Sequence, residues 1–465
     1  MLAIPRLLVA GTASGVGKTT VAVGLMRALR DRGFKVAPFK CGPDYLDPTY
    51  LSRAAGRDSQ NLDGWMMGRD AVRDTFVQGC QDADIAIIEG VMGLFDGASP
   101  RSDAGSTAEI GKWLQAPTLL VVDAGGMARS VAAVAHGFAT FDADLRLCGL
   151  ICNRVGSAGH LDLLRQAVHE PPIFGGLPKA PDAAFQQRHL GLQTAHRARV
   201  AESLLAGWGE RVAAWCDVEA LVAQARGAPA LEAPREVQSD SDVPAAACCR
   251  IGVAFDEAFH FYYADNLRRL EGLGATLVRF APLSLPRLPD VDGLYFGGGY
   301  PELFAAQLAS NTSLSADIRA FASSGGPVYA ECGGLMYLSE GIRTLDDVLH
   351  PMVGVLGGEA VVRDKLVALG YVEVETQMPS LLGGAGLRFR GHQFRYSTLE
   401  GVPHGVGRAY TVRRRRGGET TGEGYRCHNV LASYVHAHWA SNPLAAEGFV
   451  RACVARRKAK QRGEV

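Results

Sequence analysis

The chain has 465 residues, of which 47% are hydrophobic, so its length and composition allow two or three domains with full apolar cores. Lysine plus arginine and aspartate plus glutamate number 48 each, and this balance lacks the basic excess typical of duplex nucleic-acid binders. The ten cysteines include no CxxC pair, which argues against a structural zinc site and fits reduced thiols in the cytoplasm. No run of 18 or more apolar residues occurs, so we expect no membrane span.

Residues 1–225 alternate short β-rich runs with longer helical segments. Strands are predicted at residues 7–10, 36–39, 85–89, 118–122 and 147–152. Residues 19–31 carry apolar side chains at helical spacing. This alternation predicts an α/β domain in which a mostly parallel sheet is flanked by helices.

Residues 226–249 contain few large apolar side chains and are interpreted as an interdomain linker. A second alternating series begins at residues 251–254 and has further strands ending near residues 297 and 331. We therefore predict a second α/β domain at 250–465, again with a mostly parallel sheet.

The first chemical motif is Gly-Thr-Ala-Ser-Gly-Val-Gly-Lys-Thr-Thr at residues 11–20, between a predicted strand and a predicted helix. Backbone N–H groups and the positive end of a helix stabilise phosphate oxygens at such a turn. Lys18 is predicted to reach the β- and γ-phosphates of ATP, and the Thr19 hydroxyl to ligate Mg²⁺. The strict P-loop pattern has glycine where this chain has Thr12.

Charged residues also follow other predicted strands of this domain, at the sheet edge where open α/β sheets bind ligands. Glu89 ends a strand and is a candidate Mg²⁺ ligand. A Gly-Pro turn follows Lys40 and would bring Asp44 and Asp47 to the same edge, where Asp44 could complete the Mg²⁺ shell. Lys40 would face a phosphate or carboxylate, and Asp96, in a Gly-rich loop, is a candidate substrate-site residue. On spacing alone, the aspartates are equally explained as turn residues.

The second chemical motif is Pro-Val-Tyr-Ala-Glu-Cys-Gly-Gly-Leu-Met at residues 327–336, which predicts a strand, a tight turn and a helix. This is the geometry of a nucleophile elbow, with Cys332 in the turn and a helix N-terminus that would favour its thiolate. Gly298 and Gly299, in a Gly-rich loop after another strand, would form an oxyanion hole with Gly333. The base must be a histidine, and His436 and His438 are the candidates, side by side on one face of an extended segment.

The P-loop motif, with its threonine at position 12, resembles the dethiobiotin synthetase superfamily. Three further segments, Gly-Pro-Asp-Tyr-x-Asp (42–47), Glu-Gly-Val-Met-Gly-Leu-Phe-Asp-Gly (89–97) and Gly-Ser-Thr-Ala (105–108), are similar to the cobyrinic or hydrogenobyrinic acid a,c-diamide synthase family. The resemblance implies that Glu89 ligates metal and that Lys40, Asp47 and Asp96 belong to the substrate site. It also implies an ATP site made by Thr12, Gly15, Val16, Gly17, Lys18, Thr19 and Thr20, with Asn153 where the superfamily reads the adenine base.

The C-terminal half resembles class I glutamine amidotransferases. Their Gly-x-Cys-x-Gly pattern is present around Cys332, with Ala330 in place of the first glycine. Their Tyr-x-His pattern implies that His436 is the base. His438 stands where triad enzymes carry a glutamate, a loss shared by the cobyrinic and cobyric acid synthase families, so the group that orients His436 is left open.

The resemblance covers nearly the whole chain and implies a cytoplasmic ligase of cobalamin biosynthesis. Such an enzyme uses ATP, Mg²⁺ and glutamine to convert the a and c acetate carboxylates of a corrin-type polycarboxylate macrocycle into amides. The alternatives are a nickel-sirohydrochlorin a,c-diamide synthase, a cobyric acid synthase, and a P-loop ATPase that acts as a switch. The sequence leaves open whether the macrocycle contains cobalt, which carboxylate reacts first, and whether the chain forms a homodimer.

Overall fold

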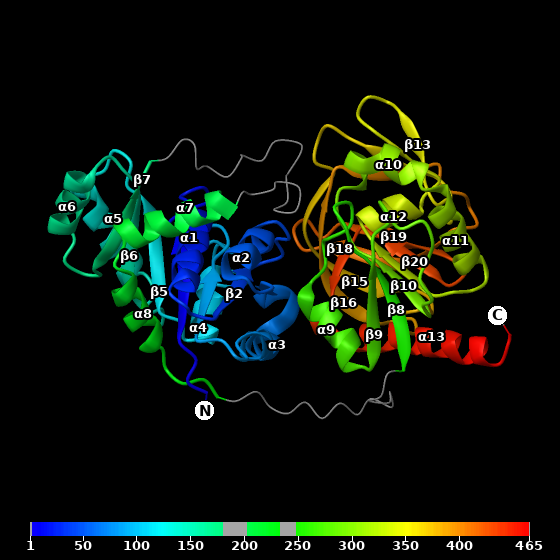
Figure 1. Cartoon of the computed structure of the whole chain (residues 1–465), viewed down its shortest axis with the longest axis horizontal. Helices are drawn as coiled ribbons and strands as arrows, with labels where there is room; N and C mark the ends of the chain where they lie inside the picture. Colours follow the sequence, from blue (N-terminus) through cyan, green and yellow to red (C-terminus); the bar gives the residue numbers. More distant parts are fainter. Residues whose placement is uncertain (1, 180–201, 233–247, 465) are drawn as a thin grey trace. The chain divides into compact units, whose positions relative to one another are not determined.

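The computed structural model describes residues 2–179, 202–232 and 248–464. Two compact units make up the chain, Met1–Val237 and Gln238–Val465, and each is described by itself. Within the described ranges, no helix combines the length and the apolar character that crossing a membrane requires. Both units consist of sheets covered by helices, so the predicted α/β fold class is confirmed (Figure 1).

The first unit is built on a seven-stranded parallel sheet in the order β3-β2-β4-β1-β5-β6-β7. Its strands are β1 (Arg6–Gly11), β2 (Val36–Cys41), β3 (Gln60–Leu62), β4 (Ile85–Glu89), β5 (Thr118–Asp123), β6 (Leu147–Val155) and β7 (Ile173–Pro178). All five strands predicted from the sequence occur, because a strand covered on both faces is a continuous apolar run.

Helices cover both faces of this sheet, and each face has its own apolar core. One core joins the sheet to α1 (Lys18–Asp31), α2 (Asp47–Ala55), α7 (Glu202–Trp215) and α8 (Val218–Arg226). The other joins it to α4 (Thr107–Trp113), α5 (Ser130–Thr140) and α6 (Ala158–Ala167). Helix α3 (Gly64–Gly79) packs Phe76 on Phe39 of β2, with ring centroids 5.0 Å apart. This layering leaves the carboxyl ends of β1, β2 and β4 at one edge, where the ligand-binding loops lie.

The segment after α8 returns to the start of the chain. Leu231 forms an antiparallel bridge with Leu2, and the two residues exchange both backbone hydrogen bonds. The fully buried Arg6 donates to the carbonyl oxygens of Pro229 (2.5 Å) and Leu114 (2.6 Å). Residues 229–231 are therefore part of the first unit, although the sequence placed them in a linker at 226–249. Residues 233–247 of that linker lie outside the described residues, and β8 begins at Cys249.

The second unit contains a ten-stranded sheet in the order β21-β16-β15-β18-β19-β20-β11-β10-β8-β9. The part from β9 to β20 is parallel, as predicted, whereas the part from β20 to β21 is antiparallel. Its strands are β8 (Cys249–Ala254), β9 (Ala275–Phe280), β10 (Gly293–Phe296), β11 (Val328–Glu331), β15 (Ala368–Thr376), β16 (Arg388–Arg395), β18 (Gly407–Arg414), β19 (Thr420–Cys427), β20 (Val430–Ser433) and β21 (His436–His438). The sequence did not predict the antiparallel extension, because its half-exposed strands lack continuous apolar runs.

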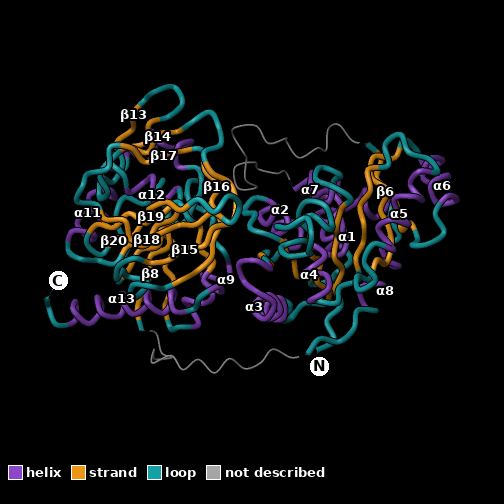
Figure 2. Tube along the Cα trace, turned by 180° about the vertical axis from the view of Figure 1, so that it is seen from behind, coloured by secondary structure: helices purple, strands orange, loops and turns teal. Residues whose placement is uncertain are grey.

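Two apolar cores lie on the two faces of this sheet. One contains residues of α10 (Ala305–Ser310), α11 (Thr312–Ser323) and α12 (Gly333–Leu338), and the other contains residues of α9 (Ala264–Gly272) and α13 (Leu444–Gln461). In Figure 2 the long α13 runs beside the strands near β8. A small second sheet is formed by β12 (Gly341–Arg343), β13 (Leu349–Pro351), β14 (Glu359–Val362) and β17 (Ser397–Glu400).

Candidate nucleotide and glutaminase sites

The turn between β1 and α1 has the backbone that a phosphate loop requires. Gly15 and Gly17 have φ of +79° and +97°, a conformation that glycine adopts without strain. The ammonium group of Lys18 donates to the carbonyl oxygen of Ala13 at 3.0 Å, across the mouth of this turn. Burial, and secondly the nearby Lys40, lower the pKa of Lys18 to about 8. A phosphate bound here would raise the pKa of Lys18 again, because an anion favours the protonated amine.

Asn153, at the end of β6, lies against this phosphate loop. Its side-chain amide donates to the carbonyl oxygen of Val16 at 2.8 Å. A Cβ atom added to Gly17 would lie 2.1 Å from that amide nitrogen. The next residue, Arg154, has φ of +59° and donates to the carbonyl oxygen of Gly15 at 2.8 Å. The structure thus brings Asn153 to the predicted ATP site and adds Arg154, for which the sequence suggested no role.

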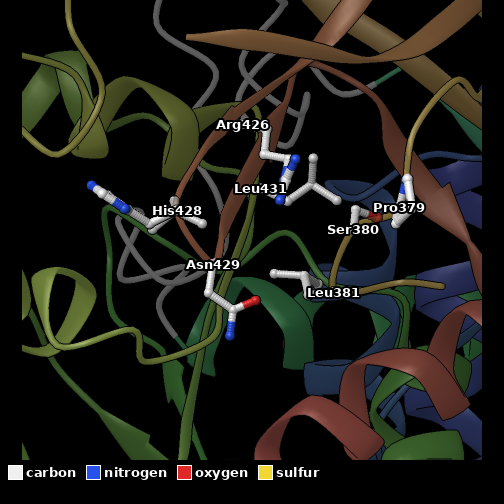
Figure 3. A pocket seen from close by; sticks show the side chains of 8 residues that line it. Pro379, Ser380, Leu381, Arg426, His428, Asn429 and Leu431 are labelled. Atoms are coloured by element: carbon white, nitrogen blue, oxygen red, sulfur yellow. The ribbon is translucent and has the colours of Figure 1, made fainter. Parts of the chain in front are cut away.

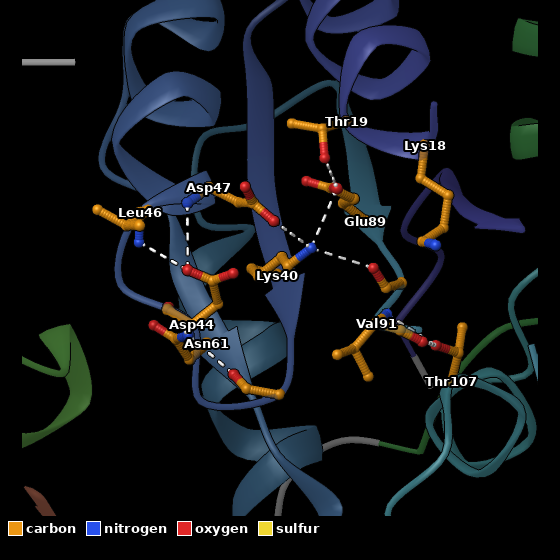
Figure 4. Close-up of polar contacts among 12 residues, drawn as sticks. Lys18, Thr19, Lys40, Asp44, Leu46, Asp47, Asn61, Glu89, Val91 and Thr107 are labelled. Atoms are coloured by element: carbon orange, nitrogen blue, oxygen red, sulfur yellow. Dashed lines mark hydrogen bonds and ion pairs between the residues drawn. The ribbon is translucent and has the colours of Figure 1, made fainter. Parts of the chain in front are cut away.

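A buried cluster of charges lies beside the phosphate loop (Figure 4). The Lys40 ammonium contacts Asp47 Oδ2 at 2.8 Å and Glu89 Oε1 at 3.0 Å. It also donates to the carbonyl oxygen of Gly90 at 3.1 Å, and the Thr19 hydroxyl donates to Glu89 Oε1 at 2.5 Å. Burial alone would lower the pKa of Lys40, but the surrounding carboxylates outweigh it and raise that pKa. Burial raises the pKa of Glu89 to about 7, and Lys40 opposes this shift.

The two aspartates of the Gly-Pro-Asp-Tyr-Leu-Asp segment have different surroundings. Asp44 Oδ1 accepts hydrogen bonds from the backbone N–H groups of Leu46 (2.7 Å) and Asp47 (3.4 Å), a turn that leads into α2. The amide of Asn61 fixes this turn by donating to the Asp44 carbonyl at 2.7 Å. Asp47, and not Asp44, makes the direct ion pair with Lys40. Asn61 was missed because it lies in a short strand without a motif.

The residues beside the phosphate loop fit a Mg²⁺ ion. This hard cation prefers oxygen ligands and usually keeps water and phosphate oxygens in its shell. The Thr19 hydroxyl and the Glu89 carboxylate supply two protein oxygens within one hydrogen bond of each other. In the described part of the chain, the buried Glu89 Oε2 has no hydrogen-bond partner. Across the same residues no group of three His, Cys, Asp or Glu side chains is arranged as metal ligands, so phosphate and water would complete the shell.

Asp96 belongs to a second hollow that opens from the phosphate loop. Its Oδ2 accepts the backbone N–H of Gly93 at 3.0 Å. Together with Thr12, these residues form the polar end of a cavity of 440 Å³. The other walls are mainly apolar: Leu94, Phe95, Ala133, Val134, Gly137, Phe138 and Phe141. The ring centroid of Phe95 lies 5.7 Å from that of Phe138 and 4.6 Å from that of Phe141, whose side chain is 73% exposed.

In the second unit, Cys332 occupies a strained turn between β11 and α12, as the elbow motif predicts. Its φ of 47° and ψ of −100° are rare for any residue other than glycine. Its backbone N–H donates to the Ser433 carbonyl at 2.8 Å, which ties the elbow to β20. A Cβ atom on Gly334, the second residue of α12, would lie 2.5 Å from the Phe296 carbonyl oxygen, so this position requires glycine.

The resting state of this thiol differs from the expectation. Burial raises the pKa of Cys332 to about 12, and Glu302 adds to the shift, whereas Arg395 and the Gly333 N–H oppose it. Burial therefore opposes the thiolate that the helix N-terminus was predicted to favour. Cys332 rests as a thiol and needs a base when it attacks.

The Gly-rich loop after β10 also departs in part from the expectation. The Gly298 N–H donates to the Phe261 carbonyl at 3.2 Å, so its predicted role as an oxyanion donor is not supported. Gly299 has φ of +156°, and a Cβ atom there would lie 2.0 Å from the Ala258 carbonyl oxygen. The N–H nitrogen of Gly299 lies 3.0 Å from the Cβ position of Gly333. The two amides that could face one oxyanion are those of Gly299 and Gly333.

The two candidate histidines on β21 have different neighbours. A Cβ atom on Gly298 would lie 2.4 Å from Cε1 of His436, so this ring lies against the Gly-rich loop. His438 Nδ1 instead lies 4.0 Å from Asp265 Oδ2, and its ring packs against Tyr263. Burial, and secondly His392, lower the pKa of His436 to about 3, so its imidazole is neutral in the resting protein. These contacts support His436 over His438 as the base.

Another hollow of the second unit lies away from this site. A cavity of 210 Å³ is lined by Pro379, Ser380, Leu381, Arg426, His428, Asn429, Val430 and Leu431 (Figure 3). Neither Cys332 nor His436 lines it. It is therefore not part of the glutaminase site.

Comparison with known proteins agrees with both halves of the chain. Residues 7–190 match the CobQ/CobB/MinD/ParA nucleotide binding domain, and residues 250–444 match the CobB/CobQ-like glutamine amidotransferase domain. A cobyrinate a,c-diamide synthase of Leptospira interrogans is 51% identical over 97% of this chain and 99% of its own length. Proteins of the same name from Syntrophotalea carbinolica (48% identity, 97% of this chain and 99% of theirs) and Priestia megaterium (41%, 98% of both) are also similar. Because these identities extend over nearly the full length of each chain, this protein belongs to the cobyrinate a,c-diamide synthase family.

Proposed function

We propose that this chain uses ATP and glutamine to convert the a and c acetate carboxylates of cobyrinate into amides. The relatives described above carry this name, and membership of their family makes the chain a ligase that takes its amido nitrogen from glutamine. The observation that carries the proposal is that one chain holds both a P-loop site, centred on Lys18, Thr19 and Glu89, and a strained Cys332 elbow whose preceding residue, Glu331, lies 3.9 Å from His436. An ATPase switch would have no use for the second site.

Ammonia would be released at Cys332. Its sulfur attacks the side-chain carbonyl carbon of glutamine, and His436 accepts the thiol proton. The amides of Gly299 and Gly333 stabilise the resulting oxyanion, and each such donor typically contributes about 2.7–4 kcal/mol. The intermediate collapses to a thioester as His436 returns the proton to the leaving ammonia. Water then hydrolyses the thioester, which releases glutamate and regenerates the thiol.

The carboxylate would be activated at the phosphate loop. An oxygen of the acetate group attacks the γ-phosphorus of ATP, which gives an acyl phosphate and ADP. Ammonia attacks the acyl carbon, phosphate leaves, and one proton is lost to give the amide. The residues from Gly15 to Thr20, with Lys18 in the centre, hold the phosphates, while Asn153 contacts the adenine base. When bound at Thr19 and Glu89, with Asp44 nearby, Mg²⁺ would neutralise phosphate charge during this transfer.

The hollow beside the phosphate loop suits the macrocycle. A corrin-type ring has apolar faces and methyl groups together with peripheral carboxylates. Phe95, Phe138 and Phe141 offer an aromatic wall, while Thr12 and Asp96 lie at the polar end next to the nucleotide site. Lys40 and Asp47 would border the substrate site, where the Lys40 charge offsets that of the reacting acetate group and Asp47 holds the Lys40 ammonium in place. We further propose that the enzyme works in the cytoplasm, which agrees with its ten free cysteines.

The test is to incubate the protein with ATP, Mg²⁺, glutamine and either cobyrinate or hydrogenobyrinate, and to follow the mass of the macrocycle. We expect two successive amidations of cobyrinate. Cys332→Ala should lose both with glutamine and recover both with free ammonia. If neither macrocycle changes mass with either nitrogen source, the corrin assignment fails, and nickel sirohydrochlorin becomes the substrate to test.

A further inference from the structure

Glu331, which immediately precedes the nucleophile, has a fully buried carboxylate. Its Oε1 accepts hydrogen bonds from the Tyr329 hydroxyl (2.9 Å) and the Ala437 N–H (3.1 Å). Its Oε2 accepts one from the Tyr295 hydroxyl (3.2 Å). The same Oε2 lies 3.9 Å from Nδ1 of His436. These contacts join three strands, β10, β11 and β21, around one carboxylate.

We propose that Glu331 is the positioning residue of the glutaminase site. It keeps His436 in the tautomer and orientation that present Nε2 to the Cys332 thiol, and it stabilises the imidazolium that forms when the thiol proton moves. In triad enzymes a buried carboxylate at Nδ1 of the base has this role. The inference rests on the glutaminase half of the proposed function.

The place of this carboxylate explains the departure from the usual triad. Class I glutaminases carry a glutamate two residues after the histidine, where this chain has His438. His438 lies against Asp265 and not against His436. The carboxylate next to His436 comes instead from the strand of the nucleophile, one residue before Cys332. Strand β20 pairs with β11 and is followed almost directly by β21, so β21 lies close enough to β11 for the Ala437 N–H to reach Glu331.

The ionisation of Glu331 gives the proposal a pH signature. Burial raises the pKa of Glu331 to about 8, and the hydrogen bonds from Tyr329, Ala437 and Tyr295 oppose the shift. Only the carboxylate form stabilises an imidazolium, so the glutaminase rate should be low at pH values below this pKa and should rise as the pH passes through it. This rising part of the pH profile is the acid limb. The titratable groups that face Glu331 and His436 have pKa values moved away from neutrality: Tyr262, Tyr295, Tyr329, Tyr410, His392 and Cys332.

Glu302, close to the thiol, also has a pKa that burial raises to about 7, so a variant must decide which carboxyl group is responsible. Glu331→Gln retains an acceptor for Tyr329 and Ala437 but removes the charge. The matched control is Glu423→Gln. Glu423 is another fully buried carboxylate of the same sheet, held by Ser433 and the backbone of Tyr434 rather than by His436.

The experiment measures glutamate release and ammonia-dependent amidation of the full chain across pH. For Glu331→Gln we expect kcat for glutamine to fall about 10³- to 10⁴-fold, as when a triad carboxylate is neutralised. KM and the ammonia-dependent reaction should be unchanged, and the acid limb of the remaining glutaminase rate should disappear. Glu423→Gln should keep the parental limb and a rate within a few-fold of the parent.

Two outcomes would overturn the proposal: a Glu331→Gln rate within a few-fold of the parent, or an unchanged acid limb. A second variant protects the test against misfolding. Tyr295→Phe removes one donor from the carboxylate and should move the limb to higher pH, and an unmoved limb would also count against Glu331. If the parent releases glutamate but amidates no corrin, the substrate assignment fails while this test of Glu331 still stands.

Discussion

At the scale of single residues, the nucleotide site depends on a buried lysine between two carboxylates. Lys40 forms ion pairs with both Asp47 and Glu89, and it opposes the rise in the pKa of Glu89 that burial causes. Glu89 meanwhile keeps one oxygen without a partner among the described residues. The cluster is therefore stable before nucleotide binds and still has an oxygen ready for the metal.

Replacing Lys40 by methionine should leave the buried Asp47 and Glu89 side chains without their ion-pair partner. We expect the free energy of unfolding of the first unit to fall by about 3–5 kcal/mol, as when one member of a buried ion pair is removed. Lys35→Met, at an exposed position on the same segment, is the control and should change stability little. Denaturant unfolding of the two variants measures the difference, and equal midpoints would show that Lys40 is not needed for stability.

The phosphate loop offers a comparison between two glycines. Gly17→Ala should place a methyl group 2.1 Å from the Asn153 amide nitrogen and also strain a backbone with φ of +97°. Gly15→Ala adds the strain alone, about 1–2 kcal/mol, because no atom lies within 4 Å of its Cβ position. In calorimetric titrations, the affinity of Gly17→Ala for ATP should be at least tenfold lower than that of Gly15→Ala. Equal losses would mean that Asn153 yields without cost.

The sequence predicts those site residues whose neighbours are close in the chain. Lys18, Thr19 and Cys332 belong to motifs in which spacing alone defines a turn. Asn61 lies in no motif, and although Glu331 stands inside the elbow motif, its contacts with Tyr295, Ala437 and His436 depend on residues far along the chain. Gly298 was assigned an oxyanion role because it sits in a Gly-rich loop, but its N–H is bound to Phe261, a contact that only the folded chain reveals.

At the scale of elements, close approach between helices depends on small residues. Gly24 of α1 faces α7, and a Cβ atom there would lie 2.6 Å from Val212 Cγ2 and 2.9 Å from the Trp208 carbonyl oxygen. The sequence predicted α1 from its apolar spacing, but it could not show that Gly24 is the point of contact. The partner helix α7 is some 180 residues further along the chain.

Gly24→Ala should therefore push α1 and α7 apart. We expect a loss of about 1–3 kcal/mol in unfolding free energy, typical of overpacking a well-filled core. Gly207→Ala, on α7 itself, meets no atom within 4 Å and should be neutral or slightly stabilising. Thermal unfolding distinguishes the two, and a Gly24→Ala protein as stable as the parent would show that the helices shift without cost.

At the scale of the whole molecule, two compact units, each with its own apolar cores, carry two separate chemistries. The order of the domains follows from the sequence, because each motif set lies in its own alternating series of strands and helices. The antiparallel part of the second sheet could not be predicted from the sequence, because its strands are partly exposed. At its two ends, β19 pairs with β20 and β16 pairs with β21. The sequence also did not predict that residues 229–231 attach to the first unit, because this contact depends on the buried Arg6, which donates to the Pro229 carbonyl.

ATP with Mg²⁺ should protect only the first unit of the full chain. Binding stabilises the form that binds, by about 2.7 kcal/mol at a hundredfold excess over Kd. Hydrogen exchange should slow in the phosphate loop, in α1 and in the turn before α2, while the Cys332 elbow exchanges at its former rate. Added protection at the elbow would instead reveal communication between the two active sites.

The strained backbone at Cys332 lowers the thermal stability of the protein at the position of its proposed nucleophile. Holding a residue with a side chain at φ of 47° and ψ of −100° lowers the free energy of unfolding by about 1–3 kcal/mol, and glycine avoids this strain. Cys332→Gly should therefore be more heat-resistant than the natural chain while being unable to use glutamine. Laboratory evolution for thermostability alone would tend to discard the proposed nucleophile at this position, and its persistence in a lineage would be a sign that glutamine is still the nitrogen source.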